Sequence, residues 1–308
     1  MFWTVTFALI AALCNSIFSL ANRVLMCRDG VGIFAGSFLV QAVSGALALL
    51  LIVFFRVPWH PGATWDMLAV VALSLTGFTF MMAAFSRDDA SAVAPLIGLK
   101  VLFLTVLEAC VFGHALGRGV WAGAVVSVVG ITLAGQNDTW SLHPRDILRP
   151  GVLLMMAGAF FFAASDLFVK RTLHVWGGAS LGVSLYLVAM TGVVTALLLL
   201  LFSRRLLHAG GWVHAWPALR SALPVLLLCA GTNYLMQLFI FSAFASAGQV
   251  TLPNIIYNTR NLFVVLIAAV LVLGAGSRVE RLGPRGYAYR TSGALLTLSA
   301  IALALLVK

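Results

Sequence analysis

The sequence predicts an all-α integral membrane protein with ten transmembrane helices arranged as two inverted five-helix repeats. Three observations lead to this fold class. Hydrophobic residues fill 62% of the 308 positions, and the mean hydropathy is +1.07, well above the roughly 45–50% apolar content of soluble domains. Apolar runs of about 20 residues, the length of a helix that crosses the hydrocarbon core, recur along the whole chain. The two halves of the chain also share a weak similarity.

Ten apolar runs are separated by short polar breaks, and each run is interpreted as one span. The expected spans cover residues 2–24, 32–55, 65–86, 92–113, 119–136, 151–173, 179–202, 221–244, 251–274 and 290–307. Met1 leads into the first run without a basic region or a cleavage site, which favours a retained span over a removed signal peptide. We expect a first repeat over residues 1–137, a connecting loop over 138–150 and a second repeat over 151–308.

Charge and cysteine content exclude several classes of partner. The formal net charge is +10, but the basic residues stand singly at helix ends, which suits membrane lipid headgroups and not nucleic acid. The four cysteines are scattered and form no C-x-x-C pair, so neither a metal site nor a disulfide framework is indicated. We expect no cofactor.

Internal comparison supports a duplication. A shift of 147 superposes residues 11–23 on 158–170, and a shift of 158 superposes Pro95 on Pro253. With an odd number of spans in each half, the two halves run antiparallel in the membrane. The interface between such repeats is where transporters hold their substrate.

Stripes of small residues mark the fifth and tenth spans. The fifth has Gly119, Gly123, Ser127 and Gly130 on one face, and the tenth has Gly293, Thr297, Ala300 and Ala304. Such stripes let helices approach closely. They predict a surface at which helices pack closely. A homodimer through these faces of spans five and ten would be one such contact.

These features resemble the drug/metabolite transporter superfamily, EamA type. The resemblance lies in the length, the 5+5 plan and the passage "FGHALGRGVWAGAVVSVVGITLAG" (residues 112–135). At this junction the family usually carries Gly-Glu, where this chain has Gly113-His114 and, in the second half, Gly274-Ala275. The resemblance implies a secondary transporter that moves a small metabolite through a central cavity. We expect it in the bacterial inner membrane, and we expect no enzyme activity because the sequence has no nucleophile–base arrangement such as G-x-S-x-G.

Four charged residues fall inside expected spans: Lys100, Glu108, Asp166 and Arg260. A charge at the bilayer centre costs about 2.5–3.5 kcal/mol on insertion scales, so it faces a cavity, a partner or both. Two interpretations are open. The four residues form buried ion pairs that hold the bundle together, or at least two of them line a substrate cavity.

Helix geometry narrows the partners. Two turns separate Lys100 from Glu108, too far for direct contact along one helix. Asp166 and Lys170 stand four apart and could pair locally, with Lys170 otherwise able to snorkel. Lys100 and Arg260 fall at similar depths after Pro95 and Pro253, where two basic groups would suit a carboxylate or phosphate.

Amide and hydroxyl groups recur at helical spacing in three spans. They bind substrate or hold neighbouring helices together. The candidates are Asn254, Tyr257 and Asn258 in span nine, Asn15 and Ser19 in span one, and Asn233 and Gln237 in span eight.

The leading interpretation is a secondary transporter that works by alternating access around a midplane site, with an amino acid, organic anion or phosphorylated compound as substrate. A lipid or lipid-phosphate flippase and a non-transporting scaffold or receptor are the alternatives. Orientation is open. Twelve Lys and Arg residues lie near the loops after odd-numbered spans and five lie on the other side, which favours termini outside, whereas the resemblance implies termini inside.

Overall fold

The computed structural model contains helices and no strands in the residues that it describes. These are residues 1–26, 33–87, 94–113, 116–134, 149–206, 211–260, 262–264, 266–267 and 284–307. The α-helices are α1 (Phe2–Met26), α2 (Ile33–Phe55), α3 (Thr64–Phe85), α5 (Lys100–Phe112), α6 (Arg118–Ala134), α8 (Pro150–Val175), α9 (Ser180–Leu206), α10 (Gly211–Ala247), α11 (Thr251–Tyr257) and α13 (Pro284–Leu306). Two short 3₁₀ helices, η1 (Pro61–Ala63) and η2 (Ala94–Leu99), precede α3 and α5.

Within the described ranges, six helices are long and apolar enough to cross a membrane: α1, α2, α3, α8, α9 and α10. Helices α6 and α13 contribute shorter apolar segments, Arg118–Leu133 and Thr291–Leu306. The expected fourth and ninth spans are interrupted in the described residues. The fourth is 3₁₀ over Ala94–Leu99 before α5 begins, and in the ninth α11 ends at Tyr257.

Long helices pack as antiparallel pairs. Helix α1 lies along α10, where the Thr4 and Ser246 hydroxyls are 3.1 Å apart near the start of one helix and the end of the other. Helix α3 lies along α8 in the same manner, with the Ser74 and Ser165 hydroxyls 2.7 Å apart. Both pairs join a helix of the first half to a helix of the second.

Glycine sets the approach of the other two pairs. Helices α2 and α9 cross where a Cβ added to Gly45 would lie 2.5 Å from the Gly192 Cα. Helices α6 and α13 meet along the predicted packing surface, since a Cβ on Gly123 would lie 2.7 Å from the Ala300 carbonyl oxygen and one on Gly130 2.8 Å from that of Gly293. The small-residue faces therefore cover each other within one chain. A homodimer through α6 and α13 would have to use their exposed residues.

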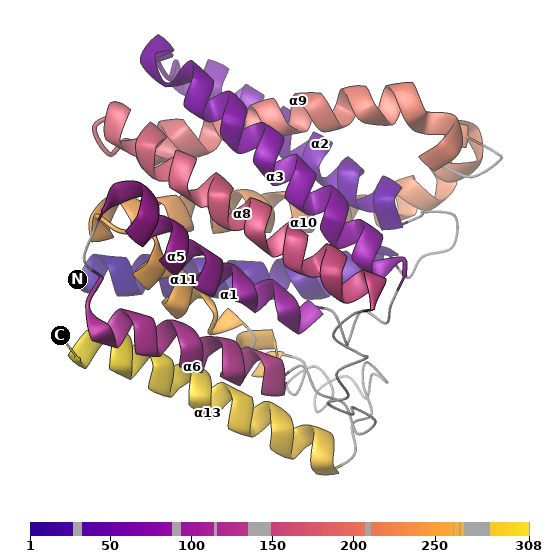
Figure 1. Cartoon of the computed structure of the whole chain (residues 1–308). Helices are drawn as coiled ribbons and strands as arrows, with labels where there is room; N and C mark the ends of the chain where they lie inside the picture. The colour runs from indigo at the N-terminus through magenta and orange to yellow at the C-terminus, as the bar shows by residue number, and fades with distance from the viewer. Residues whose placement is uncertain are drawn as a thin grey trace.

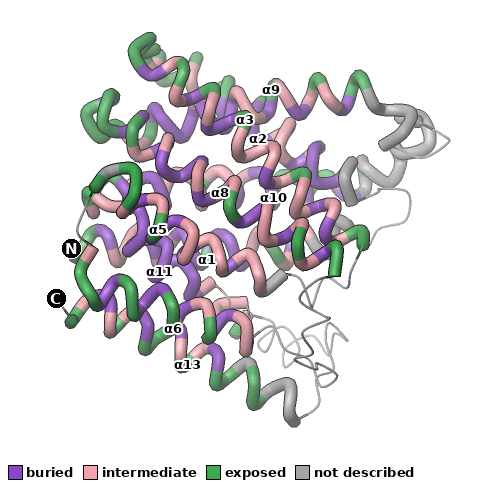
Figure 2. Tube along the Cα trace, viewed as in Figure 1, coloured by how far each residue is buried: buried purple, intermediate pink, exposed green. Residues whose placement is uncertain are grey.

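The pairs form layers in Figure 1. The α6 and α13 pair lies on one side, α2, α3 and α9 lie on the other, and α1, α5, α8, α10 and α11 occupy the centre. Figure 2 shows buried residues on the helix faces that turn toward neighbouring helices and exposed residues along the outer faces. Both chain ends lie at one end of the bundle, which we call the terminus end (Figure 1).

Candidate functional site

Two ion pairs join α5 to α8. The Lys100 ammonium lies 2.7 Å from Asp166 Oδ2, and the Lys170 ammonium lies 2.9 Å from Glu108 Oε1. The side chains of Lys100, Asp166 and Lys170 retain 21%, 12% and 17% exposure, while Glu108 retains none. The local Asp166–Lys170 pair that the spacing allowed is not the one formed, because α5 runs beside α8 in the same direction and offers each residue an oppositely charged partner.

Glu108 also binds the start of α11. Its carboxylate accepts hydrogen bonds from the Val250 amide at 3.1 and 3.2 Å, from the Thr251 amide at 3.0 Å and from the Thr251 hydroxyl at 2.7 Å. The first amides of a helix have no partner within it and carry a partial positive charge. A carboxylate from another helix therefore caps α11.

Asp166 makes a second link to α11. Its Oδ2 atom accepts from Asn254 Nδ2 at 2.9 Å as well as from Lys100. Asn254 is buried and also donates to the Val250 carbonyl at 2.9 Å. The three elements α5, α8 and α11 thus share one polar cluster, which we define as Lys100, Glu108, Asp166, Lys170, Thr251 and Asn254.

The helix of α11 is interrupted just beyond this polar cluster. After Tyr257 the backbone turns at residues 258 and 259 and becomes helical again at Arg260. Asn258 is buried at the turn and donates to Ser127 Oγ of α6 at 2.8 Å. The η2 segment breaks the corresponding first-half span after Pro95. Paired interruptions of this kind expose backbone groups at the binding sites of transporters.

Arg260 has no acidic partner among the residues that the structure describes. Its guanidinium lies 5.2 Å from the centre of the Tyr257 ring, and its carbonyl oxygen accepts from Ser16 Oγ at 2.7 Å. A cation over an aromatic face gains about 0.5–2 kcal/mol, less than the cost of an interior charge. The two ion pairs of the polar cluster balance each other, so no acidic side chain in the described part of the chain balances the positive charge of Arg260.

Of the remaining predicted residues, Asn233 joins two helices. Asn233 donates to Gln41 Oε1 at 3.2 Å and to Ser44 Oγ at 3.3 Å, which joins α10 to α2. Ser19 donates to the Asn15 carbonyl one turn earlier, a bond within α1. Asn15 is buried and Gln237 partly buried.

Lys170, Thr251, Ser127 and Ser16 were not among the residues expected in the site. Lys170 stands near the end of an apolar run, where the sequence allows it to pair with Asp166 or to snorkel, but its ammonium lies beside Glu108. The neighbouring Arg171 does remain half-exposed, 3.4 Å from Asp66 of α3. Ser127 belongs to the small-residue stripe, whose spacing indicates close helix packing and does not indicate a hydrogen bond. In the described residues, no group of three or more His, Cys, Asp or Glu side chains could hold a metal ion.

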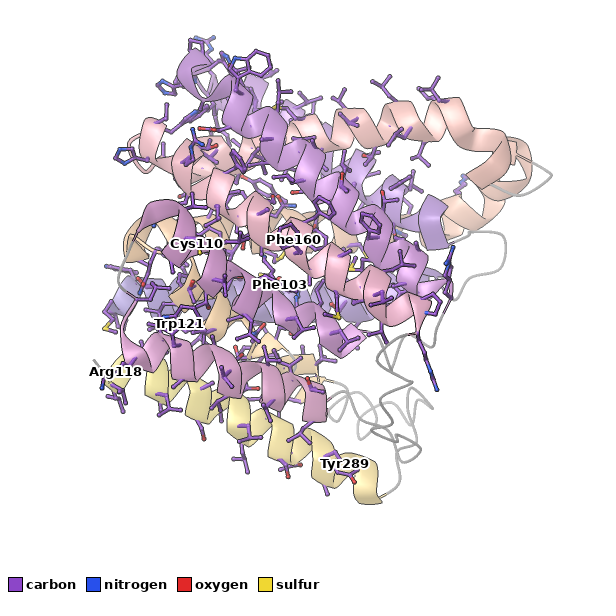
Figure 3. All side chains as sticks on the ribbon, in the orientation of Figure 1. Phe103, Cys110, Arg118, Trp121, Phe160 and Tyr289 are labelled. Carbon is purple, nitrogen blue, oxygen red and sulfur yellow. The ribbon has the colours of Figure 1, made fainter. Side chains whose placement is uncertain are left out.

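Two aromatic rings meet between α5 and α8. The rings of Phe103 on α5 and Phe160 on α8 meet edge to face, 5.8 Å between centres, and both lie with Cys110 on the side that faces the viewer in Figure 3. Phe160 is 42% exposed and Cys110 is also exposed. Apolar side chains of α5 and α8 are therefore exposed together on this side, as suits contact with lipid.

The apolar helices and the polar groups held between them define an integral, multi-pass membrane protein. Residues 2–136, a little under half of the chain, match the model of the EamA-like transporter family, which confirms for this part of the chain the resemblance that the sequence predicts. No curated protein matches the chain. A solved crystal structure of a protein with 17% identity superposes with a TM-score of 0.70 over 98% of this chain and 96% of that chain. At this identity the likeness shows the fold.

Proposed function

We propose that this protein is a secondary transporter that moves a small molecule bearing a carboxylate or phosphate, by alternating access around a midplane site. Arg260 is the observation that carries the proposal. It is a partly buried guanidinium with no acidic partner in the described residues, beside the turn that interrupts the ninth span. An anionic substrate group would supply the missing charge, and arginine binds carboxylate and phosphate through two parallel hydrogen bonds.

Helix pairing supports ten spans in two inverted repeats, residues 1–137 and 151–308 joined by 138–150. Helices α2 and α9 would be equivalent second spans, and α6 and α13 equivalent fifth spans. The α6–α13 pair is antiparallel, since Gly119 of α6 adjoins Val307 of α13 while Gly130 adjoins Gly293. Exchanging the two halves also turns the α1–α10 pair into the α8–α3 pair. This is the pattern that a twofold axis in the membrane plane produces.

Rocking of one repeat against the other would expose the site on alternate sides. The substrates to test first are amino acids, organic anions and phosphorylated compounds that occur on either side of the bacterial inner membrane. We propose no chemical step for the protein. Its polar side chains serve binding and helix contact.

Thermal unfolding of the purified protein against a panel of these metabolites tests the proposal, because a ligand of the folded state raises the melting temperature. At least one anionic metabolite should stabilise the wild type, and Arg260→Gln should weaken its binding at least tenfold. The control Arg171→Gln removes an exposed arginine that lies next to Asp66 and should bind the ligand as the wild type does.

Two outcomes would count against a soluble anionic substrate. Stabilisation only by lipid phosphates would favour a flippase. A ligand that binds Arg260→Gln as tightly as it binds the wild type would place the anionic group elsewhere.

A further inference from the structure

Glu108 connects the two halves of the chain through a single carboxylate. It lies on α5 in the first half, while Lys170, Val250 and Thr251 all belong to the second. The carboxylate has no exposed surface, so desolvation must be offset by these partners. An ammonium, two amides and a hydroxyl all donate to this one carboxylate.

These bonds lie close to the terminus end. Glu108 stands four residues before the end of α5, and α11 begins just after α10 ends at Ala247. The end of α10 is fixed beside the start of α1 by the Thr4–Ser246 contact. The start of α11 therefore lies at this end of the bundle, and Glu108 holds it there.

The equivalent position in the second half carries no carboxylate. The shift of 158 that superposes Pro95 on Pro253 also superposes Glu108 on Leu266, which is apolar and 51% exposed. A transporter with two symmetric gates would repeat the bond. The asymmetry makes the Glu108 contact specific to one of the two ends.

We propose that Glu108 is the latch of the terminus-end gate, and that the substrate path opens there when α11 leaves this carboxylate. The proposal rests on the alternating-access function above and adds the residue that closes one side. In the structure the latch is engaged, so the terminus end is closed. Glu108 acts through α11 and is a positioning residue.

A buried reporter tests the latch without any substrate. Ala243 is fully buried near the end of α10, in the same apolar cluster as Leu252 of α11. In a background without native cysteines, Ala243→Cys is placed in nanodiscs and its reaction with a hydrophilic maleimide is timed. Ala63→Cys is the matched control, since Ala63 is also fully buried but adjoins α3 and α8.

Glu108→Gln should speed labelling of Ala243→Cys about tenfold or more, because it removes charge-assisted bonds that each contribute at least that factor. Labelling of Ala63→Cys should stay within about twofold. Thr251→Val removes only the hydroxyl bond and should give a smaller rise, about threefold, at Ala243→Cys. This second variant keeps the test decisive if Glu108→Gln fails to fold.

Unchanged labelling of Ala243→Cys in the folded variants would overturn the latch, and so would an equal rise at both reporters, which means general loosening. Failure of the metabolite panel is a separate result. It would remove the proposed transport function while leaving the labelling measurement unaffected.

Discussion

The Lys100–Asp166 pair allows a quantitative test of how the polar cluster contributes to stability. We consider Lys100→Met and Asp166→Asn, singly and together. The charged atoms are 2.7 Å apart and the side chains keep 21% and 12% exposure. Charge-assisted hydrogen bonds contribute about 1.5–3 kcal/mol, and breaking a fully buried pair costs about 3–5 kcal/mol. Partial exposure points to about 2 kcal/mol for each single change.

The double variant should lose about 2 kcal/mol as well, not 4, because it leaves no unpaired charge. The amide introduced by Asp166→Asn keeps an oxygen that can accept from Asn254, so the second bond made at this position survives the substitution. Unfolding in sodium dodecyl sulfate, followed by circular dichroism, gives the free energies. Losses that add to within about 0.5 kcal/mol would refute a direct interaction between the two side chains.

Three further changes test other contacts. Gly45→Ala should cost about 1–3 kcal/mol in the same unfolding assay, since its Cβ would lie 2.5 Å from the facing backbone of α9. The control Gly231→Ala meets nothing within 4 Å and should be neutral or stabilising. Tyr257→Phe should keep the ligand affinity of the Arg260 site, whereas Tyr257→Leu should lower that affinity three- to thirtyfold because it removes the aromatic face under the guanidinium. Equal affinities of the Phe and Leu variants would exclude a contribution from this contact. Trp176→Phe should cost about 1–3 kcal/mol, because the smaller ring leaves space beside Trp59 and Tyr186, while the buried indole N–H has no acceptor to lose among the described residues. An unchanged stability would contradict this packing.

The sequence predicts helix positions better than it predicts their partners. Hydropathy places α2, α3, α8 and α9 within a few residues of their observed bounds, because membrane insertion depends on local apolar length. It misses the early start of α10 at Gly211. A proline lies in or before each interruption, in the expected fourth span and in the expected ninth. Because proline also occurs within continuous helices, its presence alone does not locate a break.

The polar cluster was predicted in part. Apolar surroundings make Lys100, Glu108, Asp166 and Arg260 conspicuous, but their pairing depends on which helices lie side by side. A residue such as Lys170, near a helix end, has both snorkelling and inward rotamers available. Only the position of α5 beside α8 selects the inward one.

Flux through reconstituted vesicles tests the central claim most directly. The anionic metabolite that stabilises the purified protein is loaded into proteoliposomes, and exchange with labelled external metabolite is timed for the wild type and for Arg260→Gln and Arg171→Gln. The account predicts saturable exchange by the wild type and by Arg171→Gln, and little by Arg260→Gln. Binding without any exchange by the wild type would mean that the protein is not a carrier for that ligand, and full exchange by Arg260→Gln would mean that this arginine is not its site.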